Sequence, residues 1–320
     1  MADHDPHLAP TPSGRSLPRP GGPDREDPGH PAALARTLAL GALRSPFKRP
    51  AAGVTAPPSR LVRPDVRVDP ARLAAYARVC GFSGTGPLPL PYPHVLAFPL
   101  AMRLMAARAF PLPLLGLVHT WIEITRHRPL PPGERTELTV RVAGLAPHRR
   151  GTEATVVTEA RVAGERVWES ASGYLARHAT RETAGRAAAT ARPDGTRPDV
   201  PLLPARAQWR LPHDLGRRYG GVSGDRNPIH LHPLTARLFG FPRPVAHGMW
   251  TLARCLAEQE PPARVHVRAD FRAPVPLPGT VVHAAEGEAF QLRGDDGRIH
   301  VTGTVRGITA AAEAASSGGR

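Results

Sequence analysis

An internal duplication is the feature of this sequence that most constrains its fold. Two blocks, residues 61–178 and 202–308, each begin with an apolar stretch of helical character and continue with several strand-like stretches. A helix followed by a run of antiparallel strands buries its apolar faces when the sheet wraps around the helix. The repeat therefore predicts an α+β fold of two similar halves, and we expect them to lie side by side with their sheets joined into one.

The predicted elements follow the same order in both blocks. In the first block the helix covers 94–109, and the strands cover 115–127, 136–145, 152–162 and 165–177. In the second block the helix covers 248–259, and the strands cover 264–272, 280–286, 287–293 and 298–307. Alternating apolar and polar residues, as in "VHVRADF", are typical of strands with one buried face.

The two blocks also align residue by residue around one short segment. "YARVCGFSG" (76–84) lies over "YGGVSGDRN" (219–227), so that a tyrosine, a valine and a glycine coincide and Phe82 falls where Asp225 stands. Between this tyrosine and the histidine at the start of the next helix, the first block is ten residues shorter and lacks the Asn-Pro-Ile-His turn. We therefore expect the second block to carry the chemistry and the first block to be catalytically inert.

The segments outside the two blocks have the composition of linkers and tails. Residues 1–60 are rich in proline, glycine and arginine and are expected to be mostly disordered, with one short transient helix at 33–45. Residues 179–201 are expected to form a linker and 309–320 a flexible tail. The chain begins without the features of a secretory signal, and no stretch of about 18 apolar residues is present. These features predict a cytoplasmic protein with no membrane partner.

The charge of the chain favours an anionic partner. The formal net charge is +15, and Lys48 is the single lysine, so arginine supplies almost all of the positive charge. A phosphate-bearing carrier such as coenzyme A or acyl carrier protein fits this charge. Nucleic acid fits the charge as well, but it is disfavoured because no DNA-binding motif is present and aromatic residues make up 5% of the chain. We expect carrier phosphates to meet some of five arginines of the second block, namely Arg237, Arg243, Arg264, Arg268 and Arg272.

The residues with chemical potential gather in "SGDRNPIH" (223–230) and "HGMW" (247–250). The first stretch has turn composition, which accounts for Asp225 and Asn227 but leaves His230 without a use. The second begins an apolar helix with Gly248, and the N-terminus of a helix offers free N–H donors and partial positive charge. A carboxylate and an imidazole opposite such donors predict a general acid–base site.

Three other interpretations of the same residues are less favoured. Asp225 with His230, His232 and His247 could hold a metal, but His-Leu-His on an extended stretch points its rings to opposite faces. Ser223 lacks the Gly-x-Ser-x-Gly context of a nucleophile. A purely structural turn is the third alternative. The two cysteines of the chain give neither a disulfide framework nor a metal-ligand pattern.

The stretch "YGGVSGDRNPIHLHPLTARLFGFPRPVAHGMW", about 32 residues, resembles the signature of the MaoC-like dehydratase, or (R)-specific enoyl-CoA hydratase, family. The shared pattern is Gly-Asp-x-Asn-Pro-x-His, then a helix, then Pro-x-x-His-Gly-Met. The resemblance implies a double hot-dog fold in which the second block is the catalytic half and the first a degenerate one. It also implies reversible hydration of 2-enoyl thioesters and dehydration of 3-hydroxyacyl thioesters, without a metal or redox cofactor.

The resemblance assigns roles to individual residues. Asp225 and His230 would hold and activate the water, Asn227 would order the turn, and Gly248 with His247 would bind the thioester oxygen. Many members carry a serine eight residues after the glycine, where this chain has Leu256.

The substrate partner implied is an acyl-CoA or acyl carrier protein thioester, and the assembly is either a monomeric double hot-dog or a homodimer. The alternatives within the fold are an inactive acyl-thioester-binding protein and a thioesterase. We expect the first half, through residues 87–100, to provide an apolar pocket for the acyl tail.

Overall fold

The computed structural model describes residues 31–48, 55, 59–180 and 201–309. Its ten strands form one sheet in the order β1-β3-β4-β5-β2-β7-β10-β9-β8-β6. The strands of the first half are β1 (Arg60–Val66), β2 (Val118–Arg126), β3 (Thr136–His148), β4 (Gly151–Val162) and β5 (Glu165–Arg177). Those of the second half are β6 (Ala205–Leu211), β7 (Val265–Phe271), β8 (Gly279–Glu286), β9 (Ala289–Gly294) and β10 (Ile299–Gly307).

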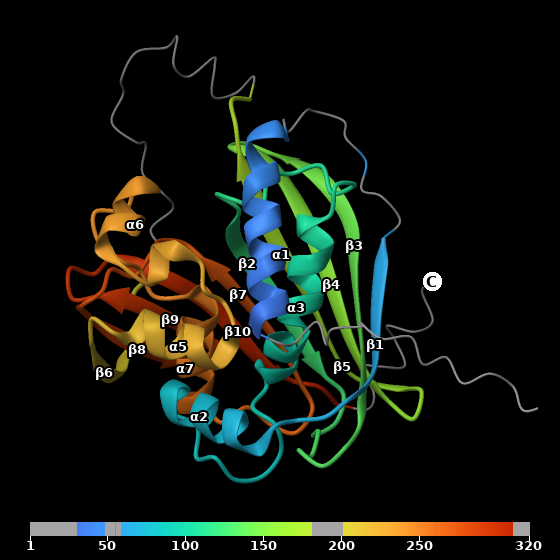
Figure 1. Ribbon diagram of the computed structural model, residues 1–320. Coiled ribbons are helices and arrows are strands. Elements are labelled where there is room, and N and C mark those ends of the chain that lie inside the picture. The colour runs from blue at the N-terminus through green and yellow to red at the C-terminus, as the bar shows by residue number, and fades with distance from the viewer. Residues whose placement is uncertain (1–30, 49–54, 56–58, 181–200, 310–320) are drawn as a thin grey trace, which may run out of the picture.

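The strand order makes the duplication visible. Read from the two edges inward, β1-β3-β4-β5-β2 has its counterpart in β6-β8-β9-β10-β7. The two halves meet where β2 pairs with β7 in antiparallel register, from Trp121 opposite Asp270 to Arg126 opposite Val265. Figure 1 shows the halves side by side, with the green strands continuing into the red ones. The predicted joining of two sheets into one is confirmed.

Each half has a long apolar helix packed against its sheet. These helices are α3 (Tyr92–Ala106) and α7 (Gly248–Gln259), close to the predicted 94–109 and 248–259. Both are buried along most of their length, including Met105 of α3 and Leu252 and Leu256 of α7. Their side chains belong to one core cluster that extends through both halves.

A second pair of helices confirms the alignment of the two blocks. These are α2 (Pro70–Cys80) and α5 (Leu215–Ser223), which pack against each other. They end at Gly81 and Gly224, whose φ angles of 82° and 84° lie in the left-handed region that glycine tolerates best. The buried rings of Tyr76 and Tyr219 lie 6.1 Å apart between the helices. Residues aligned in the sequence therefore occupy equivalent places.

The N-terminal segment differs from its expectation where the structure describes it. Residues 31–44 form a helix, α1 (Pro31–Arg44), followed by the short η1 (Ser45–Phe47). Helix α1 packs against α3 (Figure 1) and buries Leu34, while Lys48 donates to the carbonyl of Ala107 at 2.9 Å. These contacts make α1 part of the folded domain and not a transient helix in a tail.

The remaining segment predictions concern parts of the chain that are mostly outside the described residues. Residues 1–30, most of the linker at 179–201 and nearly all of the tail at 309–320 belong to this group. None of the helices in the described part of the chain has the length and apolar character needed to cross a bilayer.

Candidate active site

The turn at 223–230 is held by its own backbone and side chains. The amide of Asp225 donates to Ser223 Oγ at 3.1 Å, and the amide of Asn227 donates to Asp225 Oδ1 at 3.1 Å. The amide of Ile229 donates to Asn227 Oδ1 at 3.4 Å at the start of η2 (Pro228–His230). Asx side chains that accept from the backbone two residues ahead fix a turn of this kind. Oδ1 of Asp225 is thus used within the turn, whereas Oδ2 lies on the side of His247.

Two glycines of α5 bring this turn close to the helix. A Cβ on Gly216 would collide with the carbonyl oxygen of His230, and one on Gly220 would lie 2.8 Å from the carbonyl oxygen of Asp225. The missing side chains allow the backbone that carries both candidate catalytic residues to lie directly on α5. Two of the three glycines in "LGRRYGGVS" therefore have a packing reason.

Asp225, His230 and His247 come together as the sequence predicted. Their side-chain ligand atoms all lie within 4.8 Å of one another. The rings of His230 and His247 stack with centroids 3.7 Å apart, and His247 Nε2 lies 3.9 Å from Asp225 Oδ2. The Asp225 side chain is 31% exposed while that of His247 is 2% exposed, so the carboxylate is the more open of the two.

The hydrogen bonds of the two histidines fix their tautomers. His230 Nδ1 donates to the carbonyl of Val245 at 2.7 Å, and His247 Nε2 donates to the carbonyl of Asp225 at 2.9 Å. Burial lowers the pKa of His230, and burial together with His230 lowers the pKa of His247 to about 3, although the Asp225 carboxylate opposes both shifts. Both rings are therefore neutral at pH 7, and Nε2 of His230 is a proton acceptor.

Gly248 begins α7 beside this cluster. As the first residue of the helix, its amide has no partner within the helix. The ring of Phe271, at the end of β7, approaches within 3.2 Å of the position that a Cβ on Gly248 would take. The glycine thus leaves room for an aromatic wall next to a free donor. Leu256, where many family members have serine, is fully buried in the core.

The first half also contacts the turn at 223–230. Helix α3 carries His94 and Phe98 on one face, and Phe98 Cδ1 lies 3.9 Å from the position that a Cβ on Gly224 would take. The Asp225 carboxylate also acts on His94, opposing the lowering of its pKa by burial. The segment 87–100, predicted to be an apolar lining, therefore turns one histidine toward the site.

The same geometry bears on the metal-site and serine-nucleophile interpretations of these residues. His232 Nδ1 accepts from the amide of Leu234 and caps α6 (Pro233–Leu238), so it is not in the cluster. Among the described residues, Asp225, His230 and His247 are the set that could hold a metal ion. The hydroxyl of Ser223 accepts a hydrogen bond from the turn and is buried, which is the environment of a structural side chain.

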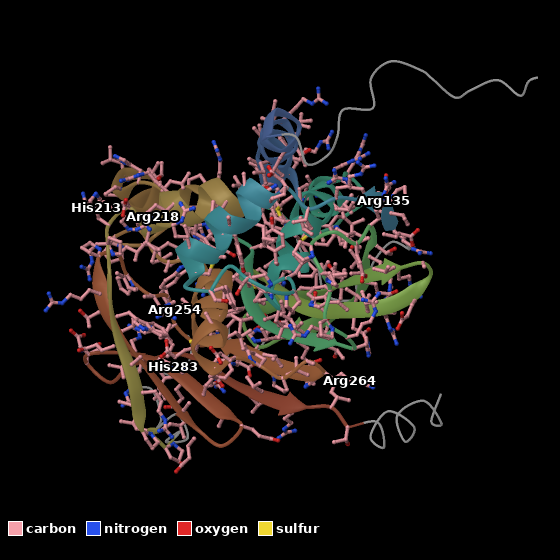
Figure 2. The ribbon with its side chains drawn as sticks, turned by 90° about the horizontal axis from the view of Figure 1, so that it is seen from below. Arg135, His213, Arg218, Arg254, Arg264 and His283 are labelled. Atoms are coloured by element: carbon pink, nitrogen blue, oxygen red, sulfur yellow. The ribbon has the colours of Figure 1, made fainter. Side chains whose placement is uncertain are left out.

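The arginines of the second half are not equally available to a carrier. Arg268 donates to Glu123 at 2.6 Å and to Asp270 at 3.0 Å, so two carboxylates neutralise it. A cavity of about 380 Å³ elsewhere is lined by four arginines that the sequence did not single out, Arg78, Arg210, Arg218 and Arg254. Figure 2 shows Arg218 and Arg254 on the side of the molecule that carries β6. A phosphate-bearing carrier has more positive charge to meet there than at Arg268.

Fold and site together define a double hot-dog protein with a carboxylate–imidazole pair at the seam of its halves. Comparison with known proteins agrees. Residues 187–311 match the model of the MaoC-like domain. The chain is 37% identical over 251 residues to 3-hydroxyacyl-thioester dehydratase X of Mycobacterium tuberculosis, covering 76% of this chain and 88% of that protein. The chain belongs to the MaoC-like dehydratase family.

Solved structures give the same result. The crystal structure of HtdX from Mycobacterium tuberculosis superposes with a TM-score of 0.68 at 36% identity, covering 78% of this chain and 100% of that one. A MaoC-like dehydratase from Phytophthora capsici shares the fold, with a TM-score of 0.62 at 18% identity over 80% of this chain and 97% of that one. The predicted family and fold are confirmed.

Proposed function

We propose that this chain catalyses the reversible hydration of 2-enoyl thioesters to (R)-3-hydroxyacyl thioesters. The observation that carries the proposal is the convergence of the Asp225 carboxylate with the His230 and His247 rings, directly before Gly248, whose amide begins α7. The 3-hydroxyacyl-thioester dehydratase and the peroxisomal enoyl-CoA hydratase 2 of Arabidopsis thaliana among the relatives support the same reaction class. The thioester is carried by coenzyme A or by acyl carrier protein.

In the hydration direction, a water molecule lies between Asp225 and His230. His230 Nε2 is the base, because Nδ1 is committed to the Val245 carbonyl and the ring is neutral. As the water oxygen forms a bond to C3, its proton passes to Nε2 and the C2–C3 π electrons move toward the thioester oxygen. The second hydrogen stays on the oxygen and becomes that of the product hydroxyl; it donates a hydrogen bond to the Asp225 carboxylate, which also stabilises the imidazolium electrostatically.

The second step returns the proton. The enolate oxygen is stabilised by the Gly248 amide at the positive end of α7. The imidazolium then donates its proton to C2, which restores neutral His230 and completes the addition of one water. Hydroxyl and proton arrive from the same side of the substrate, so the addition is syn. Dehydration follows the same path in reverse.

The experiment that tests the proposal measures two products in one assay. Purified protein with crotonyl-CoA or 2-octenoyl-CoA is expected to consume the enoyl absorbance and form the 3-hydroxyacyl thioester, with no release of free thiol. Thiol release without hydration would replace the proposal by a thioesterase. Binding of the thioester without either product would indicate an inactive acyl-binding protein.

Chelation separates acid–base chemistry from metal chemistry at the same three side chains. We expect hydratase activity to be unchanged after treatment with 1,10-phenanthroline and dialysis, because the proposed steps need only the side chains and the Gly248 amide. Metal analysis of the purified protein is the companion measurement. Loss of activity that added Zn²⁺ restores would refute the acid–base mechanism and make Asp225, His230 and His247 metal ligands.

A further inference from the structure

Three rings of the first half, those of His94, His119 and Tyr174, form a row that meets Phe271 of β7. His94 and His119 have nearly parallel rings with centroids 6.0 Å apart, and His119 stacks on Tyr174 at 4.7 Å. His119 also packs against Phe271 at 4.9 Å, and Phe271 is the ring that adjoins Gly248. The row therefore leads from the neighbourhood of Asp225 to the predicted thioester-binding amide.

Two nitrogen atoms in this row have no hydrogen-bond partner among the residues that the structure describes. They are His94 Nδ1 and His119 Nε2, and both are buried. Burial lowers the pKa of His94 to about 4, and burial with the neighbouring His94 lowers the pKa of His119 to about 3. Both imidazoles are thus neutral. His119 donates to the backbone of Trp121 through its other nitrogen, so His119 Nε2 is an acceptor, whereas His94 Nδ1 can donate or accept. Buried polar atoms in proteins are almost always paired, so two unpaired atoms beside one site suggest that a ligand group completes them.

From this arrangement we propose that His94 and His119 form a specificity subsite for a hydroxyl or carbonyl oxygen on the acyl chain of the substrate. The proposal rests on the hydratase function proposed above and names the class of acyl group that the site prefers. The oxygen lies a few carbons beyond C3, because C3 itself is held at Asp225 and His230. The two rings are specificity residues, and they take no part in the proton transfers.

Because the two nitrogens are buried, the part of the substrate that reaches them is the acyl chain and not the carrier. A carrier as large as coenzyme A or a protein must remain outside, whereas His94 is only 8% exposed and lies on a central helix. Tyr174 and Phe271 pack over His119, so an entering acyl chain reaches the nitrogens by displacing these rings. A plain alkyl chain would have to displace the same rings, at the same cost in free energy, and would still leave the two nitrogens without a hydrogen bond.

The test compares substrates that differ by one oxygen. kcat/KM is measured for 2-octenoyl-CoA and for its 5-hydroxy and 6-hydroxy counterparts, with the wild-type protein and with His94→Phe and His119→Phe. We expect the wild type to prefer at least one hydroxylated substrate by about tenfold, the effect of one well-made hydrogen bond. Each variant is expected to lose that preference and to keep its activity on 2-octenoyl-CoA within about threefold.

His283→Phe is the matched control. His283 is also buried with both ring nitrogens unpartnered, but it stacks on Trp209 of β6, on the side shown with Arg254 in Figure 2. Its substitution is expected to leave the preference unchanged.

The outcomes separate the two proposals. If the wild type hydrates all three substrates without preferring a hydroxylated one, the subsite is refuted and the hydratase stands, whether or not the variants fold. If the variants lose activity on all substrates equally, the rings act on the reaction itself and the subsite is again refuted. If the wild type hydrates none of them, the proposed function has failed.

Discussion

Asp225→Asn and His230→Ala are each expected to lower kcat by about 100-fold or more, since one acid–base group contributes about 10²–10⁴. The asparagine keeps an oxygen that can accept from the Asn227 amide, so the turn is preserved while the charge that holds water and stabilises the imidazolium is lost. The alanine removes the acceptor nitrogen at which we place the proton. The measurement is the steady-state rate on 2-octenoyl-CoA, with the thermal unfolding midpoint recorded for every variant.

His232→Ala is the matched control for both substitutions. His232 lies in the same stretch of sequence but caps α6 and does not contact Asp225. It should keep near-normal turnover with a small loss of stability, typical of a lost helix cap. Near-normal turnover in both Asp225→Asn and His230→Ala would mean that the pair has no part in the chemistry.

Mild acid should destabilise this protein strongly. The pKa of His94 is about 4 and those of His119 and His247 are about 3, because burial disfavours the charged ring. The unfolded chain has ordinary histidines with a pKa of about 6.5, so below that pH it binds more protons than the folded protein. Stability is therefore complete above about pH 7 and falls as the pH decreases from about 6.5 toward 4.

The size of this effect follows from linkage. One proton more on the unfolded state lowers the free energy of unfolding by about 1.4 kcal/mol per pH unit, so these three histidines together give about 4 kcal/mol per unit. Since whole domains are stable by about 5–15 kcal/mol, we expect unfolding near pH 5. Urea unfolding at pH 7.5, 6.5 and 5.5 measures the slope.

Substitution identifies the groups responsible for this slope. The double variant His94→Phe/His119→Phe removes two of these groups and should lower the slope by about 3 kcal/mol per pH unit, by the same linkage. His213→Asn is the matched control, because it replaces an exposed histidine and leaves the three buried rings in place. Stability that is unchanged between pH 7.5 and 5.5 would show that these histidines are not held neutral in the fold.

The two edge strands show where sequence patterns stop being informative. Strands β1 and β6 lie at the ends of the sheet, where one side of each has no partner strand. Their sequences, "RLVRPDV" and "ARAQWRL", contain arginines and, in β1, a proline, so neither has the alternation that revealed the inner strands. Charged residues and proline are the usual protection of exposed edges, and they conceal a strand from a pattern-based prediction.

Helix α5 was missed for a related reason. Its sequence "LGRRYGGVS" has three glycines, which oppose helix formation. Gly216 and Gly220 are present because the backbone of the turn at 225–230 lies against them. Tertiary contact thus outweighs the local preference of the chain, and a single sequence does not contain that contact.

Only the part of the candidate site that the second half contributes was predictable from the sequence. Asp225, Asn227 and His230 lie within six residues, so their proximity is local and follows from the turn. His94 and His119 come from another helix and another strand and reach the site through the pairing of two halves. No spacing in the sequence indicates that they lie near Asp225. The alignment of the blocks gave only the weaker signal that His94 corresponds to His247.

The most direct test of the account is the product formed from 2-octenoyl-CoA by wild-type protein and by Asp225→Asn, resolved on a chiral column. We expect the wild type to form (R)-3-hydroxyoctanoyl-CoA as its single product, and the variant to form it at least 100-fold more slowly. Formation of the (S) product, or equal rates for the two proteins, would contradict the placement of the reaction at Asp225 and His230.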